Sequence, residues 1–205
     1  MEQLVKELIA RRALKTRSII SAFRRTDRQK FVRPETAAEA YGDYPLPIGF
    51  GQTISQPYTV AFMLELLEPR QGEKILDVGS GSGWTTALLA HIVGEKGKVF
   101  GVEIVPELVA FGQENLKKNK LPQAEIRQAG EIFGLPEEAP FDRILVSAAS
   151  SKVVPPELLT QLKAGGTMII PLGNSIMRLR KTAAGKTEVE EFPCVVFVPL
   201  VPCQK

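Results

Sequence analysis

Apolar residues in the middle of the chain gather in short continuous runs, and between these runs they recur at helical spacing. Short continuous apolar runs are typical of strands that are buried on both faces of a sheet. The alternation therefore predicts an α/β fold: a Rossmann-like, doubly wound, mostly parallel sheet with helices on both faces. The predicted strands are residues 74–78, 98–104, 124–128, 143–148 and 167–172, and the predicted helices are residues 58–68, 85–93, 106–119 and 156–163.

The two ends of the chain follow different patterns. Helical spacing near the N-terminus would turn Ile19 and Phe23 inward, and two alternating segments near the C-terminus predict a terminal antiparallel element. The further predicted elements are helices at 2–13 and 16–25, an Ala-rich turn or short helix at 36–41, a hairpin of 177–182 and 187–192 around the turn 183–186, and a final strand at 194–200. We expect one domain over 1–205, in which residues 1–57 supply N-terminal helices and a loop and residues 58–205 form the core.

Residues 43–57 break both patterns. The segment holds three prolines and two glycines in fifteen positions, a composition that does not sustain a regular helix or strand. We therefore predict an irregular loop, whose distinctive sequence sets it apart from a linker. Long shaped loops in compact domains often carry function.

Composition places the chain among ordinary α/β domains. Its 205 residues are 44% hydrophobic and 24% charged, and no stretch approaches the roughly 20 apolar residues that span a bilayer. The N-terminal residues lack the apolar core and the small-residue cleavage site of an export signal. Two cysteines, Cys194 and Cys203, and the one histidine, His91, cannot supply the four ligands of a structural zinc site. We therefore expect a cytoplasmic protein with free thiols, no bound metal and no membrane contact.

The net charge of +3 conceals an uneven distribution. Residues 1–33 carry ten Lys and Arg side chains against three acids, so the remainder of the chain has a net charge of −4. Such a basic segment is typical of proteins that bind nucleic acid or an acidic partner. A pair of solvated helices would give the same counts, and no aromatic side chains for base stacking are interleaved with the charges. We favour the second interpretation and expect no nucleic-acid partner.

The strongest local signal is the run from Leu76 to Trp84, which reads Leu-Asp-Val-Gly-Ser-Gly-Ser-Gly-Trp. Three glycines at alternate positions allow the backbone to turn sharply at the end of a strand and to come close to a ligand. The helix that follows presents free backbone N–H groups to a carboxylate or a phosphate. The spacing G-x-G-x-G differs from the dinucleotide pattern G-x-G-x-x-G, because residue 84 is tryptophan. A turn that only packs a strand tightly against a helix is the alternative.

Glu103 ends the second predicted strand, twenty residues after Gly83. A carboxylate at this place can accept hydrogen bonds from both hydroxyls of a ribose. A solvated acid at a strand end is the alternative, and because NAD and S-adenosylmethionine both contain ribose, Glu103 does not choose between them. Two further acids, Asp77 and Asp142, are expected to fix strand and loop ends rather than to touch a substrate.

These motifs resemble those of the class I S-adenosylmethionine-dependent methyltransferases, both in the glycine run and in Gly101-Val102-Glu103. A narrower resemblance lies in the loop. Residues 46–58 read L-P-I-G-F-G-Q-T-I-S-Q-P-Y and are similar to the signature of the protein-L-isoaspartate O-methyltransferase family. Collinear matches extend the resemblance over nearly the whole chain, at residues 28–32, 40–43, 139–144, 148–149, 161–166 and 197–200.

The resemblance implies methyl transfer from S-adenosylmethionine to the free α-carboxylate of L-isoaspartyl residues in damaged proteins and peptides, which is a repair reaction. The ester that forms returns to a succinimide without help from the enzyme. An Asp-type carboxyl titrates near pH 4, so it is already ionised at neutral pH. The reaction therefore needs alignment and removal of water more than it needs a base.

The resemblance also implies roles for individual residues. Ser55, the serine of the Thr-Ile-Ser segment, would take the catalytic role by orienting the substrate carboxylate or the methyl donor, and an N-cap of the following helix is its alternative. The substrate groove would be lined by Ile48, Gly49, Thr53 and Ile54. The cofactor S-adenosylmethionine would be bound by Gly79, Ser80, Gly81, Ser82, Gly83, Glu103, Gly130 and Glu131. We expect the chain to act as a monomer.

Two positions depart from the family pattern. Family members commonly carry Gly-Asp-Gly after the third strand, where this chain has Ala129-Gly130-Glu131, so the acid is missing or displaced to Glu131. Family members usually carry Gln-x-Leu after the fifth strand, where this chain has Met177-Arg178-Leu179. Both positions would face the cofactor or the substrate. They leave open a methyltransferase with another acceptor, or a catalytically silent homologue that binds a partner. The glycine spacing and the loop disfavour a nicotinamide oxidoreductase.

Overall fold

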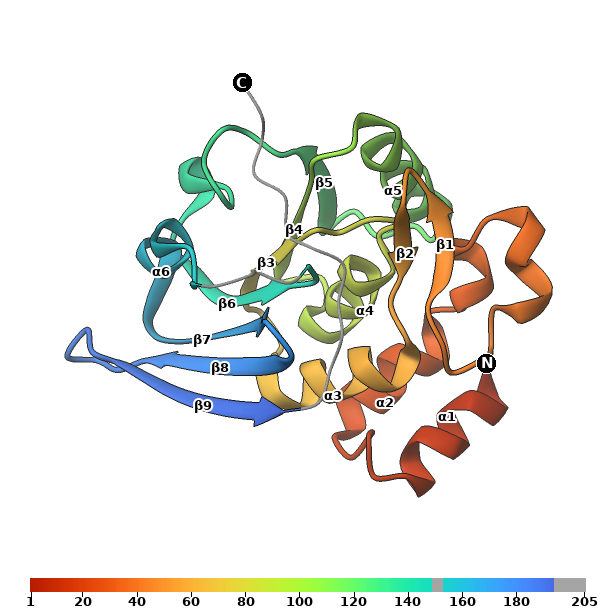
Figure 1. Ribbon diagram of the computed structural model, residues 1–205, viewed down its shortest axis with the longest axis horizontal. Coiled ribbons are helices and arrows are strands. Elements are labelled where there is room, and N and C mark those ends of the chain that lie inside the picture. Colours follow the sequence, from red (N-terminus) through yellow and green to blue (C-terminus); the bar gives the residue numbers. More distant parts are fainter. Residues whose placement is uncertain (149–152, 194–205) are drawn as a thin grey trace.

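A seven-stranded sheet forms the centre of the computed structural model, which describes residues 1–148 and 153–193 (Figure 1). The strands are β3 (Lys74–Val78), β4 (Lys98–Glu103), β5 (Ala124–Gln128), β6 (Phe141–Val146), β7 (Leu162–Leu172), β8 (Ser175–Lys181) and β9 (Thr187–Pro193). Their spatial order is β5-β4-β3-β6-β7-β8-β9. Neighbours from β5 to β7 pair in parallel, whereas β8 and β9 pair antiparallel. This arrangement confirms the predicted mostly parallel sheet with a terminal antiparallel element.

Helices cover both faces of the sheet. One face carries α3 (Pro57–Leu67), α4 (Trp84–Val93) and α5 (Pro106–Lys118), and the other carries α6 (Pro156–Gln161) and the short 3-10 helix η3 (Pro136–Glu138). The N-terminal segment adds α1 (Glu2–Ala10), α2 (Arg17–Arg25) and the 3-10 helices η1 (Arg28–Phe31) and η2 (Pro34–Glu39), with α2 packed on α4. Among the described residues no helix is long and apolar enough to cross a membrane.

Alternate residues of the strands enter different cores, as expected for a sheet that is covered on both faces. In β3, Ile75 packs into the larger cluster beneath α3, α4 and α5, whereas Leu76 packs into the cluster on the α6 side. In β6, Leu145 and Ile144 divide between the two clusters in the same way. The same register turns Asp77 towards α4, because it shares a face with Ile75.

The order of strand addition reverses at β3. From β3 the chain adds β4 and then β5 on one side, and it then crosses over to add β6 and β7 on the other side. In open α/β sheets, ligands bind in the crevice at the carboxyl ends of the strands beside such a reversal. The segments that follow β3, β4, β5 and β6 meet at this edge.

The segment 43–57 is more regular than predicted. It contains an antiparallel ribbon of β1 (Leu46–Gly49) and β2 (Gln52–Ile54). The prediction of an irregular loop is wrong here because Ile48 and Ile54 are buried and hold both arms against the core. Residues 49–51 all have positive φ and make the tight connection between the arms.

Several predicted ends are shifted. The first helix stops at Ala10 rather than at residue 13, and Arg12 has a left-handed φ of 59°. Helix α6 ends at Gln161 rather than at residue 163, because β7 begins at Leu162 and runs for 11 residues. The predicted final strand at 194–200 and both cysteines lie outside the described residues.

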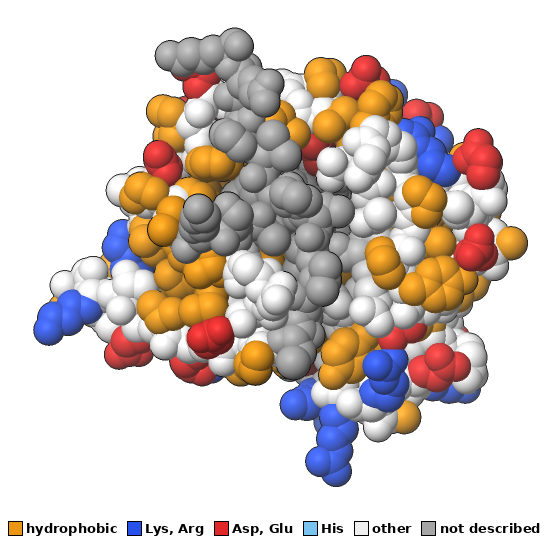
Figure 2. Space-filling view, viewed as in Figure 1, with side chains coloured by type: hydrophobic (Ala, Val, Ile, Leu, Met, Phe, Trp, Pro, Cys, Tyr) orange, Lys and Arg blue, Asp and Glu red, His pale blue; other side chains and the backbone are white. Residues whose placement is uncertain are grey.

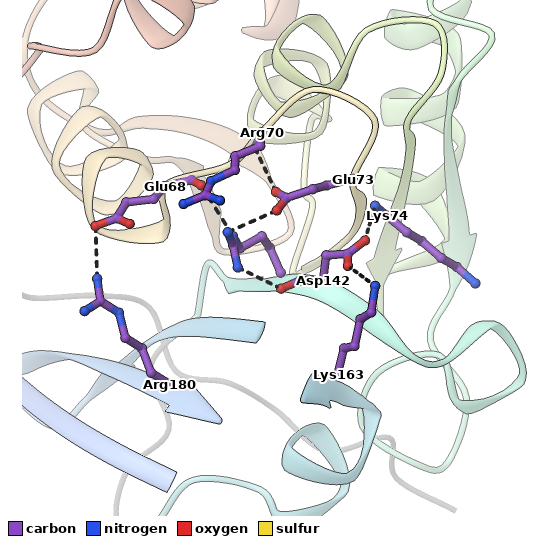
Figure 3. Close-up of polar contacts among 8 residues, drawn as sticks. Glu68, Arg70, Glu73, Lys74, Asp142, Lys163 and Arg180 are labelled. Atoms are coloured by element: carbon purple, nitrogen blue, oxygen red, sulfur yellow. Dashed lines mark hydrogen bonds and ion pairs between the residues drawn. The ribbon is translucent and has the colours of Figure 1, made fainter. Parts of the chain in front are cut away.

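Charged side chains form a network at the edge of the sheet where the parallel strands begin (Figure 3). Asp142 accepts hydrogen bonds from the backbone N–H of Lys74 at 2.9 Å and from Lys163 Nζ at 2.7 Å, which confirms that it fixes a strand end. Arg143 is only 6% exposed and pairs with Glu73 at 3.0 Å. This network lies at the opposite end of the strands from the crevice, so its role is to hold the strands and the segment before β3 together.

Candidate active site

The glycine run connects β3 to α4 by a tight turn in which Gly81 and Gly83 have φ of 51° and 83°. A Cβ on Gly83 would lie 3.3 Å from the carbonyl oxygen of Gly112 in α5, and a Cβ on Gly81 would lie 3.2 Å from Ile48 Cδ1 in the ribbon. The turn is therefore packed between α5 and the ribbon, and side chains at these positions would push one of them away.

Asp77 binds the first turn of α4. Its buried carboxylate accepts hydrogen bonds from the hydroxyls of Thr85 at 2.7 Å, Thr86 at 2.6 Å and Ser147 at 3.3 Å. Burial raises the pKa of Asp77 to about 6, although the three hydroxyl donors act in the opposite direction. Asp77 thus joins β3, α4 and the end of β6, which confirms the expectation that it fixes a strand end.

Glu103 binds the glycine turn from the neighbouring strand. Its Oε2 accepts the backbone N–H of Gly81 at 2.9 Å, and its Oε1 accepts those of Ile104 at 2.7 Å and Val105 at 3.0 Å. The residue is 6% exposed. A carboxylate has about four acceptor positions, so Oε2 keeps one for a ligand hydroxyl. Bonding to two ribose hydroxyls at once would require one of the Oε1 bonds to be exchanged.

A pocket, here called the main pocket, opens over the carboxyl ends of β3, β4, β5 and β6. Its empty space, including the open mouth, is about 780 Å³. Its walls are the glycine turn, the end of β4 with Glu103, the segment after β5, the end of β6 and the ribbon. The residues that contribute are Ile48, Gln52, Thr53, Val78, Gly79, Gly81, Val102, Glu103, Ile104, Ala129, Gly130, Glu131, Ile132, Phe133, Gly134, Ser147 and Ala148.

A smaller pocket, here called the serine pocket, adjoins the main pocket and has an empty space of about 300 Å³. Its own wall residues come from the ribbon end, the glycine turn and the start of α4, and they are Ile54, Ser55, Ser80, Ser82, Trp84 and Thr85. Thr53, Gly79, Gly81 and Ser147 line both pockets. A molecule that fills the main pocket would therefore reach the edge of the serine pocket.

The two pockets bring together all the predicted site residues except Gly49 and Gly83. Gly83 begins α4 and faces α5, as described above. Gly49 ends β1 with φ of 95°, and a Cβ on it would lie 3.6 Å from Arg33. Both glycines shape the backbone beside the pockets and do not contribute to their walls.

Ser55 does not cap α3. The N-cap is Gln56, which makes no side-chain cap bond, and the N–H of Tyr58 is bound by the Asp43 carboxylate at 2.8 Å. Within the described part of the chain, the Ser55 hydroxyl has no hydrogen-bond partner, and the residue lines the serine pocket. The N-cap alternative is therefore wrong, and the hydroxyl is available to a ligand.

Of the two departures from the family pattern, only the first lies among the described residues that line a pocket. Gly130 and Glu131 are exposed and line the main pocket beside Ala129, so the segment reaches the site whether the usual acid is missing or displaced to Glu131. Met177 lies on β8, pairs with Ile170 across the sheet and packs against the cluster on the α6 side.

Sequence reasoning missed several wall residues. Ser147 and Ala148 could have been found, because residues that follow a strand of a doubly wound sheet enter the crevice. Ile132 and Phe133 could not, because the segment after β5 is irregular and carries no periodicity. Ile132 is 54% exposed at the rim of the main pocket, which places a large apolar side chain where a ligand would enter.

Two buried polar atoms of residues that line the serine pocket have no hydrogen-bond partner within the described residues. They are Ser80 Oγ and Trp84 Nε1, and their residues are only 4% and 1% exposed. Both atoms are closed to solvent, and Ser80 Oγ lies against Gly101 of β4, where an added Cβ would be 3.1 Å from it. The open acceptor position on Glu103 fits a ligand that carries a hydroxyl group.

Several basic N-terminal residues are used within the fold. Arg24 pairs with Glu2 at 3.1 Å. Arg33 donates from Nε to the carbonyl oxygen of Ile48 at 2.7 Å, and Arg28 is buried. On the face shown in Figure 2, acidic and basic side chains are interspersed rather than gathered by sign. These contacts agree with the interpretation of the N-terminal charge as part of an ordinary helical layer.

Comparison with known proteins agrees with this geometry. A statistical model of the family described as protein-L-isoaspartate(D-aspartate) O-methyltransferase matches residues 1–205. The chain is 46% identical over 206 residues to a protein-L-isoaspartate O-methyltransferase of Anaeromyxobacter dehalogenans, covering 98% of this chain and 97% of that protein. It is 42% identical over 205 residues to one of Methanopyrus kandleri, covering 98% and 90%.

A solved structure is also similar over nearly the whole chain. It is a Plasmodium falciparum protein described as a protein-L-isoaspartate O-methyltransferase in complex with S-adenosyl-L-homocysteine. The TM-score is 0.85, with 27% sequence identity and 97% of each chain covered. Motifs, fold and relatives therefore agree, and this chain belongs to the protein-L-isoaspartate(D-aspartate) O-methyltransferase family.

Proposed function

We propose that this chain transfers the methyl group of S-adenosylmethionine to the free α-carboxylate of L-isoaspartyl residues in proteins and peptides. The observation that carries the proposal is the wall shared by the two pockets, formed by Thr53, Gly79, Gly81 and Ser147. A donor in the main pocket and an acceptor held near Ser55 would meet where the two pockets adjoin at these residues, as a direct displacement requires. Family membership supplies the substrate class, because the relatives are named for it.

Residues of the main pocket and of the glycine turn would hold the donor. Glu103 would accept a ribose hydroxyl at the open position on Oε2, and Gly130 and Glu131 would lie along the adenine end. The glycine turn, Gly79–Gly83, would lie along the amino-acid end. Bound S-adenosylmethionine supplies a methyl group that is electrophilic because its sulfur is positively charged.

The acceptor side needs no general base, because an aspartyl-type carboxyl is already ionised at neutral pH. The Ser55 hydroxyl would donate a hydrogen bond to one carboxylate oxygen and leave the other oxygen directed at the methyl group. Ile48, Gly49, Thr53 and Ile54 would line the path of the substrate chain and limit the access of water to the attacking oxygen.

Methylation makes the damaged carboxyl a better electrophile. The backbone nitrogen that follows the isoaspartyl residue can then attack the ester carbonyl, and methanol leaves as the succinimide closes. Hydrolysis of the succinimide allows return to the normal aspartyl linkage. Both pockets are formed within one chain, and we expect a monomer to be sufficient for activity.

Transfer of a tritiated methyl group to two versions of one peptide tests the proposal. The peptides differ only in carrying an isoaspartyl or an aspartyl linkage at one position. We expect the isoaspartyl version to be labelled about a hundredfold faster or more. The free carboxylate of an aspartyl residue is at the end of its side chain, whereas that of an isoaspartyl residue is the α-carboxylate. Equal labelling would favour a methyltransferase with another acceptor, and absence of S-adenosylmethionine binding would favour a catalytically silent homologue.

Ser55→Ala tests the acceptor site in the same assay. Loss of a hydrogen bond to a charged group costs about 1.5–3 kcal/mol, so kcat for the isoaspartyl peptide should fall by about tenfold to a hundredfold. Ser18→Ala removes a serine hydroxyl on the exposed face of α2, outside both pockets, and should leave kcat unchanged. A Ser55→Ala enzyme with the activity of the wild type would remove Ser55 from the mechanism.

A further inference from the structure

Arg28 is a buried arginine with no ion-pair partner among the described residues. It lies in η1 and is 0% exposed. Its guanidinium donates hydrogen bonds to four backbone carbonyl oxygens, those of Ala40 at 2.8 Å, Gly42 at 3.2 Å, Tyr44 at 3.0 Å and Ser55 at 3.1 Å. Residues 40–44 therefore fold around the guanidinium on one side, and the end of the ribbon meets it on another.

The guanidinium remains charged in this environment. Burial lowers the pKa of Arg28 to about 10, and the nearby charge of Asp43 acts in the opposite direction. Burial of a charge without a bonded counter-ion is costly unless dipoles replace the lost water. The four carbonyl groups supply these dipoles, so the position of each carbonyl is tied to the position of Arg28.

The same guanidinium contacts two walls of the serine pocket. It binds the carbonyl of Ser55, and its central carbon lies 5.2 Å from the ring centroid of Trp84, within the range of a cation–π contact. Ser55 and Trp84 both line the serine pocket. Arg28 thus lies behind this pocket and connects the end of the ribbon to the first residue of α4.

We propose that Arg28 is a positioning residue for methyl transfer, which holds the backbone of Ser55 so that its hydroxyl is directed into the serine pocket. The inference rests on the proposed function of Ser55. A guanidinium presents five N–H donors in one plane and in fixed directions, so it can bind two separate segments and lie over a ring at once. A lysine would keep the charge, but its three N–H groups on one atom cannot maintain all of these contacts.

A double-mutant cycle between Arg28 and Ser55 tests the inference. The kcat and KM for the isoaspartyl peptide are measured at saturating S-adenosylmethionine for the wild type, Arg28→Lys, Ser55→Ala and the double variant. If Arg28 acts through Ser55, Arg28→Lys should lower kcat by about tenfold in the wild type and by less than about twofold when Ser55 is already alanine. Calorimetric binding of S-adenosylhomocysteine, within about fivefold of the wild type, would show that the glycine turn is intact in each variant.

Arg143→Lys is the matched control. Arg143 is also buried and also donates to a backbone carbonyl, that of Asp142 at 3.2 Å, but it lies at the other end of the strands. This variant should lower the melting temperature and leave kcat unchanged in both Ser55 backgrounds. If Arg28→Lys does not fold, judged by circular dichroism, Arg28→Gln takes its place in the cycle, because it keeps two N–H donors without a buried charge.

Equal losses of kcat in the two Ser55 backgrounds, or no loss at all, would overturn the role of Arg28. Failure of the proposed function would look different. In that case the wild type would label isoaspartyl and aspartyl peptides equally, and the coupling between Arg28 and Ser55 would still be measured on the labelled peptide.

Discussion

Asp77 and Glu103 are both buried carboxylates on adjacent strands, yet their surroundings give them different tasks. Asp77 lies inside β3 and faces α4, where three hydroxyls surround it. Glu103 is the last residue of β4, where the strand ends at the crevice, and backbone N–H groups bind it. The first carboxylate is enclosed by protein, and the second keeps an acceptor position towards the main pocket.

Asp77 should make the stability of the wild type depend on pH. Its pKa is raised from 3.8 to about 6, so the folded protein holds this proton more tightly than the unfolded chain does. The contribution to stability is therefore fully present below about pH 4 and is lost as the pH rises to about 6, a loss of roughly 3 kcal/mol. Urea unfolding of the wild type and Asp77→Asn from pH 4 to 8 measures it. The free energy of unfolding of the wild type should fall relative to that of the variant up to about pH 6, and above this pH the difference between the two should stay constant. A difference that does not vary with pH anywhere in this range would contradict the raised pKa of Asp77.

Glu103→Ala should weaken cofactor binding. The substitution removes the acceptor for a ribose hydroxyl and releases the N–H of Gly81, so the dissociation constant of S-adenosylhomocysteine should rise by about tenfold or more. Calorimetry provides the measurement. Glu107→Ala removes an exposed acid from the first turn of α5, outside both pockets, and should leave the constant unchanged. Unaltered affinity in Glu103→Ala would show that the ribose lies elsewhere.

At the scale of elements, the site depends on how closely α5 approaches the glycine turn. Gly112 lies in the middle of α5, where glycine weakens a helix. A Cβ there would lie 2.6 Å from Ile126 Cδ1 and 3.0 Å from the carbonyl oxygen of Gly81. The close approach therefore explains a residue that helix propensity disfavours.

Gly112→Ala should consequently destabilise the protein although alanine favours helices. We expect the free energy of unfolding to fall by about 1 kcal/mol or more, because the overpacking exceeds the gain in propensity. The affinity for S-adenosylhomocysteine should fall as well, since the carbonyl of Gly81 must move. Gly130→Ala makes the same chemical change where nothing lies within 4 Å, and it should leave the free energy of unfolding unchanged. Urea unfolding of the wild type and the two variants measures these free energies. A Gly112→Ala variant more stable than the wild type would mean that α5 can move away from the glycine turn without cost.

The ribbon of β1 and β2 shows which features of a segment local sequence patterns can predict and which they cannot. Two prolines and two glycines within residues 45–51 disfavour a regular element, yet β1 and β2 form because Ile48 and Ile54 find a core to enter. The composition correctly indicated a shaped functional segment. It could not indicate pairing, because pairing depended on the packing of Ile48 and Ile54 into the core and of Ile48 against the glycine turn.

At the scale of the whole molecule, we expect residues 1–205 to unfold as one unit. The single tryptophan, Trp84, is 1% exposed and meets Phe23 of α2 edge-on at 5.7 Å, so its fluorescence reports on the contact between the N-terminal layer and the core. Urea transitions followed by Trp84 fluorescence and by far-ultraviolet circular dichroism should coincide. An earlier fluorescence transition would show that the N-terminal layer separates first.

Local sequence patterns were enough to predict the alternation of strands and helices, the glycine turn, Glu103 at a strand end and the resemblance to a family. These are features of short stretches, in which apolar spacing, glycine and proline act on their own neighbours. The folded chain was needed to show that β6 lies beside β3, that Ser55 joins Ser80 and Trp84 around one pocket, and that Arg28 is buried rather than part of a basic surface. Each of these depends on contacts between residues far apart in the chain. The pattern of apolar positions predicts which residues are buried, but it does not predict which residues they pack against.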